Sequence, residues 1–101
     1  MAKGYWIGRV DVINADGYQA YVKAARVVFG KYGARVLVSG STFETMEGAS
    51  RGRNVVLEFA DYATALACYN SPEYQATKKY RAGAIVLDLI VIEDTTGCSR
   101  D

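Results

Sequence analysis

The spacing of apolar residues changes along the chain, and each spacing predicts one kind of secondary structure. Stretches rich in β-branched and aromatic residues predict four strands, over residues 5–13, 34–39, 54–59 and 84–93. Apolar residues at helical spacing between Asn14 and Gly33 predict one long helix, capped by the asparagine side chain and ended by a left-handed glycine. Residues 42–46 are expected to form a short, irregular strand, and residues 47–53 a hairpin loop.

The only proline of the chain marks a corner between two shorter helices. Asp61 is expected to cap the first of them. Ser71 is expected to cap the second, because Pro72 at the first helical position lacks the N–H group that would otherwise have no partner there. Glu73 then places a carboxylate in the first turn, where the helix dipole favours negative charge. This second helix is predicted to extend to about Ala82.

In chain order the elements are β-α-β-β-α-β, which is the ferredoxin-like arrangement. It is an α+β fold in which helices cover one face of an antiparallel sheet. Strand alternation places Trp6 and Val10 on the opposite face from Arg9 and Asp11. Apart from Asp88, the last strand is apolar on both faces, so we expect a second subunit to cover the open face of the sheet. The expected assembly is a homodimer in which two sheets close into an α+β barrel.

Length and charge narrow the class of protein. The 101 residues are typical of a single domain, with an expected core over about residues 3–94 and a polar, frayed tail over 95–101. The net charge of +1, with acids and bases mixed, gives no electrostatic drive towards nucleic acid or an anionic membrane. The longest apolar run is too short to span a bilayer and the N-terminus lacks a signal-peptide core, so we expect a cytoplasmic protein.

The sequence contains no histidine and two cysteines. The lack of histidine removes the commonest general base at neutral pH and most zinc and haem ligation. Cys68 falls in a predicted helix and Cys98 in the tail, without a CxxC spacing, so neither a disulfide framework nor a metal site is expected. We expect no bound cofactor, and chemistry would have to use carboxylates, tyrosines, lysines or arginines.

Five ionisable residues fall within the predicted strands: Arg9, Asp11, Arg35, Glu58 and Asp88. Burying charged groups is costly unless they are paired. If these residues converge inside the barrel, they would form a polar pocket for a small carboxylate or phenol, with Glu58 or Asp88 as the candidate catalytic base. The alternative is a set of structural ion pairs at strand edges or at the dimer interface.

The corner between the short helices is a second candidate site. The free N–H groups of a helix start attract anions, and Ser71, Tyr74 and Arg81 are the candidate ligand-binding residues there. The alternative is that these residues only cap the helix and pack around it. Trp6 likewise has two interpretations: it lines a cavity for a flat apolar ligand, or it packs in the core.

Two segments resemble a known family. Residues 3–7 (Lys-Gly-Tyr-Trp-Ile) are similar to its N-terminus, and residues 69–75 (Tyr-Asn-Ser-Pro-Glu-Tyr-Gln), followed by Lys78 and Arg81, are similar to its signature. The family is domain-of-unknown-function family 1330, within the dimeric α+β-barrel superfamily, and the resemblance covers about residues 3–94. It implies the ferredoxin-like fold and the barrel dimer, and no assigned activity. Superfamily relatives include cofactor-independent monooxygenases, muconolactone isomerases and haem-binding enzymes, several of which depend on a histidine that this chain lacks.

We therefore expect a small cytoplasmic homodimer that binds a small organic molecule in a pocket between sheet and helices. Cofactor-independent isomerisation or oxygenation is the chemistry that the superfamily resemblance suggests, which is a fold-level analogy. The alternative is a non-enzymatic dimeric binding or stress-related accessory protein without a catalytic site. The sequence leaves open whether the protein is an enzyme, which ligand it binds, and whether the loop at 47–53 covers a site.

Overall fold

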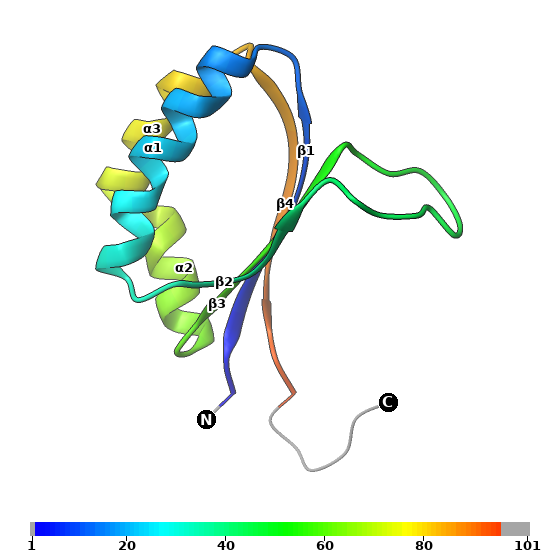
Figure 1. The fold of residues 1–101 in the computed structure, drawn as a ribbon. Coiled ribbons are helices and arrows are strands. Elements are labelled where there is room, and N and C mark those ends of the chain that lie inside the picture. Colours follow the sequence, from blue (N-terminus) through cyan, green and yellow to red (C-terminus); the bar gives the residue numbers. More distant parts are fainter. Residues whose placement is uncertain (1, 96–101) are drawn as a thin grey trace.

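The computed structural model describes residues 2–95. In chain order the elements are β1 (Gly4–Val12), α1 (Ala15–Lys31), β2 (Arg35–Gly40), β3 (Arg53–Phe59), α2 (Tyr62–Asn70), α3 (Pro72–Arg81) and β4 (Ile85–Glu93). The strands form one antiparallel sheet in the order β2-β3-β1-β4, and the helices lie on one of its faces (Figure 1). This is the ferredoxin-like α+β fold that the hydrophobic pattern predicts. The predicted frayed tail falls almost entirely on residues 96–101, which lie outside the described part of the chain.

The helix caps are those that the sequence predicts. The side chains of Asn14 and Asp61 accept hydrogen bonds from the backbone N–H groups of Gly17 (3.0 Å) and Thr64 (2.7 Å), which opens α1 and α2. Ser71 ends α2 and caps α3. Gly33 follows α1 with a φ of 68°, the left-handed conformation that a residue with a side chain adopts at a cost.

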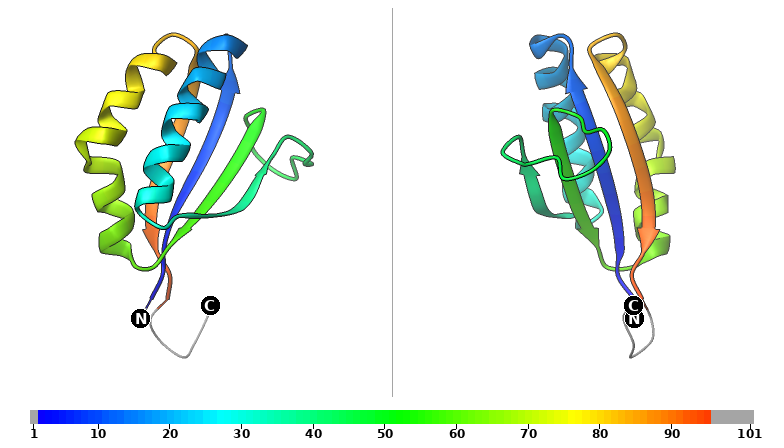
Figure 2. Two further views of the ribbon diagram at one scale, coloured as in Figure 1. Left: turned by 60° about the vertical axis from the view of Figure 1, so that its left-hand side comes forward. Right: turned by 90° about the vertical axis from the view of Figure 1, so that its right-hand side faces the viewer.

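The predicted short strand over residues 42–46 is wrong. These residues belong to a continuous loop between β2 and β3, within residues 41–52. β3 begins at Arg53, opposite Val10 of β1, so no strand lies beside residues 42–46 to accept their backbone hydrogen bonds. The loop instead projects from the sheet on the side away from the helices (Figures 1 and 2). We refer to residues 41–52 as the projecting loop.

The strand register separates two chemically different faces. Trp6 of β1 lies opposite Leu57 of β3 and Val91 of β4, and these residues face the helices. The other face is not covered by any described residue except those of the projecting loop, and we call it the open face. Its residues are Tyr5, Ile7, Arg9, Asp11, Arg35, Val38, Asn54, Val56, Glu58, Val86, Asp88, Ile90 and Ile92.

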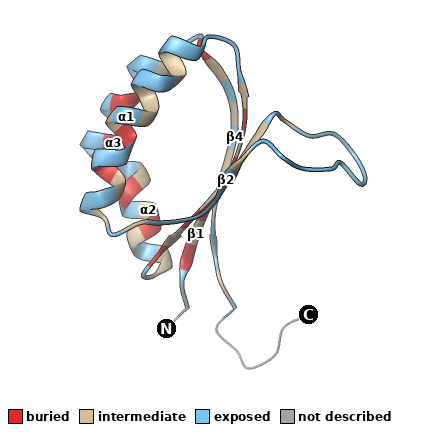
Figure 3. Ribbon diagram, viewed as in Figure 1, coloured by how far each residue is buried: buried red, intermediate tan, exposed pale blue. Residues whose placement is uncertain are grey.

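The core is concentrated under α2 and the start of α3, with Trp6 and Tyr74 at its centre. Trp6 is 3% exposed, and its indole N–H donates to the Ala65 carbonyl oxygen at 2.9 Å. The Trp6 ring meets the Tyr74 ring edge to face, with the ring centres 5.0 Å apart. α2 packs directly on the sheet, whereas α1 packs mainly along α3 (Figures 1 and 3). α1 therefore lies further from the sheet than α2 does.

Candidate functional site

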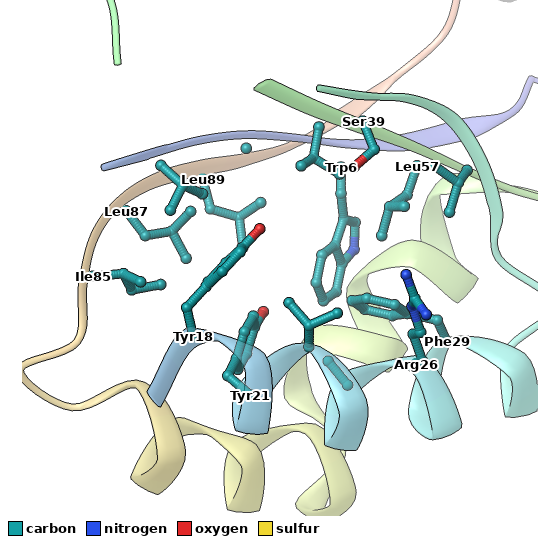
Figure 4. Close-up of a pocket in the computed structure, with 16 residues that line it drawn as sticks. Trp6, Tyr18, Tyr21, Arg26, Phe29, Ser39, Leu57, Ile85, Leu87 and Leu89 are labelled. Carbon is teal, nitrogen blue, oxygen red and sulfur yellow. The ribbon is translucent and has the colours of Figure 1, made fainter. Parts of the chain in front are cut away.

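A cavity of about 170 Å³ lies between α1 and the helix-facing side of the sheet (Figure 4). Its floor is formed by β1, β3 and β4, its roof by α1, and one side by the edge strand β2. Most of the sixteen lining residues are aliphatic or aromatic, including Trp6, Phe29, Leu57, Leu87 and Leu89. The walls therefore favour an apolar molecule over water.

Gly8 leaves part of this space open. It lies in the middle of β1, on the face that meets the helices, between Trp6 and Val10. A β-carbon added at Gly8 would meet only the side-chain methyl groups of Leu87 and Leu89, each at an ordinary 3.6 Å. Backbone crowding thus does not require glycine here. A glycine inside a strand often marks a place where another molecule approaches the backbone closely.

The lining side chains carry three hydroxyls and one guanidinium, contributed by Tyr18, Tyr21, Ser39 and Arg26, besides the indole N–H of Trp6, which is bonded to the Ala65 carbonyl oxygen. The hydroxyl of Tyr21 shares a hydrogen bond of 2.7 Å with that of Tyr74. Burial is the main cause that raises the pKa of the Tyr21 phenol far above its usual value, and the neighbouring Tyr74 adds to it. Tyr21 therefore stays protonated and can donate or accept a hydrogen bond, but it is not a base near neutral pH.

The structure places Arg9, Asp11 and Asp88 together on the open face, where they hold the base of the projecting loop. The Arg51 side chain donates to the carboxylates of Asp11 and Asp88, both at 2.7 Å. Arg9 donates to the Ala49 carbonyl oxygen at 2.6 Å. The Gly52 N–H bond and Arg51 lower the pKa of Asp11. These contacts match the alternative of structural ion pairs.

Glu58 and Arg35 lie in a second group, further along the sheet. Glu58 is opposite Tyr5, whereas Asp88 is opposite Arg9, four residues along β1. At about 3.3 Å per residue these positions are roughly 13 Å apart. Glu58 accepts a hydrogen bond of 3.3 Å from the Tyr5 hydroxyl. Arg35 is opposite Glu58 in the register. The five strand residues thus share one face but form two groups.

The corner residues belong to the helix-facing side of the sheet. The Ser71 hydroxyl donates to the Cys68 carbonyl oxygen at 2.7 Å and accepts from the Tyr74 N–H at 3.1 Å, so its only proton is used within the corner. Tyr74 is completely buried. Arg81 places its guanidinium 5.4 Å from the centre of the Tyr21 ring, a cation–π contact. Tyr74 and Arg81 therefore contact the lining residue Tyr21 without lining the cavity themselves.

None of the eight charged and corner residues singled out as candidate site residues lines the cavity, and ligand binding by the open face or the corner stays a prediction. Trp6, expected either to line a cavity or to pack in the core, does both. The residues that line the cavity and were not singled out as a site include Gly8, Tyr18 and Arg26. Two sequence signals point to Gly8 and Arg26: a glycine inside a strand, and an arginine at the edge of the apolar stripe of α1, four residues after Val22. Within residues 2–95, no three histidine, cysteine, aspartate or glutamate side chains lie close enough to hold a metal ion.

The fold and the cavity define an α+β protein of the ferredoxin-like class. A family model described as "Domain of unknown function (DUF1330)" matches residues 3–95, so the chain belongs to this family. No curated protein matches the sequence. None of the helices described here has the length and apolar character needed to cross a membrane.

Several solved structures share the fold. The protein of unknown function RPA0582 from Rhodopseudomonas palustris is 18% identical, with a TM-score of 0.71 over 95% of this chain and 85% of that one. SnoaB, a cofactor-independent oxygenase from Streptomyces nogalater, is 8% identical, with a TM-score of 0.64 over 99% and 100%. A dimeric ferredoxin-like protein of unknown function from Thermobifida fusca is 11% identical, with a TM-score of 0.59 over 91% and 89%. At these identities the likeness concerns the fold alone.

Proposed function

We propose that this protein binds a small, mainly apolar organic molecule in the cavity between α1 and the sheet. The observation that carries the proposal is the combination of an apolar cavity of about 170 Å³ with a glycine in the strand that forms its floor. An engineered apolar cavity of about 150 Å³ binds benzene, so this volume suits a molecule with one ring or its equivalent. The hydroxyls of Tyr18, Tyr21 and Ser39 would orient such a molecule.

Binding is favoured over catalysis by the composition of the walls. Among the described residues, none of the sixteen that line the cavity is a carboxylate, histidine or lysine, and Tyr21 keeps its proton. Proton abstraction in the cavity would therefore lack a base of suitable pKa. The cofactor-independent oxygenase SnoaB has the same fold, which supports oxygenation of an intrinsically reactive ligand as the second candidate function. Oxygen uptake that depends on both ligand and protein would distinguish the second candidate from binding alone.

The experiment that tests binding is a titration of methyl-labelled protein with benzyl alcohol, a neutral one-ring probe, followed by NMR. We expect the methyl signals of the cavity residues Leu57, Leu87 and Leu89 to shift. The signals of Ile90 and Ile92 on the open face serve as the internal control and should stay in place. Shifts confined to the open face, or none at all, would overturn the proposal.

We also infer that two copies of the chain pair through their open faces. Large apolar side chains are exposed there, with Val86 41%, Ile90 54% and Ile92 44% accessible. An exposed apolar area of this kind on a sheet usually marks an interface. The structure from Thermobifida fusca, which is described as dimeric, supports the same inference. The projecting loop leaves the sheet on this side and would flank the second copy (Figure 2).

Replacing Ile90 by glutamate is expected to convert the dimer to a monomer, because the charge would be desolvated at the centre of the paired faces. Light scattering after size-exclusion chromatography measures the mass. Val27→Glu is the matched control, since Val27 is 68% exposed on α1 and does not line the cavity. A wild-type monomer, or an Ile90→Glu variant that stays dimeric, would contradict pairing through the open face.

A further inference from the structure

Arg26 lies at the edge of the apolar stripe of α1, where its side chain is exposed to solvent and also lines the cavity. Val22 precedes it by four residues and Phe29 follows it by three, and both line the same cavity. Figure 4 shows the Arg26 side chain rising from α1 beside Phe29 towards the sheet. Because Arg26 is both exposed and part of the lining, its guanidinium lies where the cavity meets solvent. A ligand that enters the cavity from solvent would pass this charge.

The charge of Arg26 is not neutralised within the described chain. Among residues 2–95, Arg26 makes no ion pair or hydrogen bond, whereas Arg51 is paired with two aspartates. Arg26 is also the only charged residue among the sixteen that line the cavity. The solvent-exposed rim of the cavity thus carries one positive charge that no other described residue neutralises. Its electrostatic complement is a ligand with one negative charge.

The position of the charge suggests how such a ligand would lie. Arg26 lines the cavity together with Val36 and Ser39 of the edge strand β2, which are themselves exposed. The aliphatic wall of Ile85, Leu87 and Leu89 comes from β4, at the opposite edge of the sheet. The charged end of a bound molecule would therefore lie near β2 and solvent. Its apolar body would extend over Gly8 towards β4.

We propose that the ligand is a monocarboxylate whose apolar body is about the size of one aromatic ring, with its carboxylate held by Arg26. This inference rests on the proposed function, because it names the class of ligand for the same cavity. The planar guanidinium matches a carboxylate through two parallel N–H···O bonds. The Ser39 hydroxyl adds a donor on the same side of the cavity. Phosphate monoesters fit less well, since their second negative charge meets no second cation in the lining.

The test compares phenylacetate with its neutral isostere phenylacetamide. Trp6 is the single tryptophan of the chain and lines the cavity, so its fluorescence reports binding of either probe. We expect phenylacetate to bind at least tenfold more tightly than phenylacetamide. Arg26→Gln keeps a side chain of similar helix propensity and removes the charge, so it should reduce phenylacetate affinity about tenfold or more. It should leave phenylacetamide affinity unchanged.

Lys23→Gln is the matched control, because it removes a positive charge from an exposed position of α1 that does not line the cavity. It should leave both affinities unchanged. Equal affinities for the two probes, with no effect of Arg26→Gln, would overturn the carboxylate inference and leave the binding function standing. An equal loss in the Lys23 and Arg26 variants would show a general charge effect and would also overturn it. No binding of either probe to the wild type would overturn both proposals.

Discussion

Replacing Gly8 by valine is expected to stabilise the protein and to abolish ligand binding. The new β-carbon would make ordinary contacts of 3.6 Å with Leu87 and Leu89, and the two further methyl groups would occupy the cavity. Glycine inside a strand costs roughly 0.5–1 kcal/mol relative to alanine, and valine suits a strand better than either. We therefore expect the free energy of unfolding to rise by about 1 kcal/mol. Benzyl alcohol affinity should fall more than tenfold, because its space is filled.

Urea unfolding and the NMR titration together measure both effects. Gly8→Ala is the graded control: it supplies the contacts with Leu87 and Leu89 but fills less of the cavity, so it should stabilise the fold and weaken binding only partly. A valine variant that still binds with wild-type affinity would show that the ligand lies elsewhere. A valine variant that is strongly destabilised would show that Gly8 is required by the fold rather than by a ligand.

Replacing Tyr74 by alanine is expected to lower the free energy of unfolding by about 3–5 kcal/mol, the usual cost of removing a buried aromatic ring. Tyr74 is completely buried, and its ring packs against those of Trp6, Phe29 and Tyr69. A domain of this size has about 5–15 kcal/mol of stability in total, so the variant should unfold at a much lower urea concentration.

Tyr74→Phe separates packing from hydrogen bonding. It keeps the ring but removes the hydroxyl that meets Tyr21 at 2.7 Å, so it should cost only about 1–2 kcal/mol. The comparison is made by urea unfolding followed at Trp6. If the phenylalanine variant were as unstable as the alanine variant, the hydroxyl pair and not the ring packing would hold this part of the core.

The fold could be predicted because its determinants are local in the sequence. Alternation in the strands assigned Trp6 and Arg9 to opposite faces, and the register confirms it. The caps Asn14, Asp61 and Ser71 each form the predicted hydrogen bond. These features need no knowledge of distant residues, since each depends on neighbours within one turn or one strand.

The sequence predicts a pocket between sheet and helices, but its lining residues other than Trp6 could not be predicted, because they depend on the distance between α1 and the sheet. That distance is set by how α1 packs on α3 and by the side-chain volumes of strands far apart in the sequence. The partner of Asp11 and Asp88 was likewise missed, because Arg51 lies in a loop whose path has no periodic signal. The five charged strand residues do share the open face of the sheet. The alternation of side chains along a strand cannot show whether such residues line a ligand pocket or hold a loop in place.

The most direct test of the central claim is a crystal structure of the protein soaked with 4-bromobenzyl alcohol, with diffraction data collected at the bromine absorption edge. The bromine position shows where the ring binds without any assumption about the site. We predict an anomalous peak inside the cavity, between Gly8, Val22 and Leu87, in the wild type and none there in Gly8→Val. A peak on the open face beside Ile90, with an empty cavity, would contradict the account.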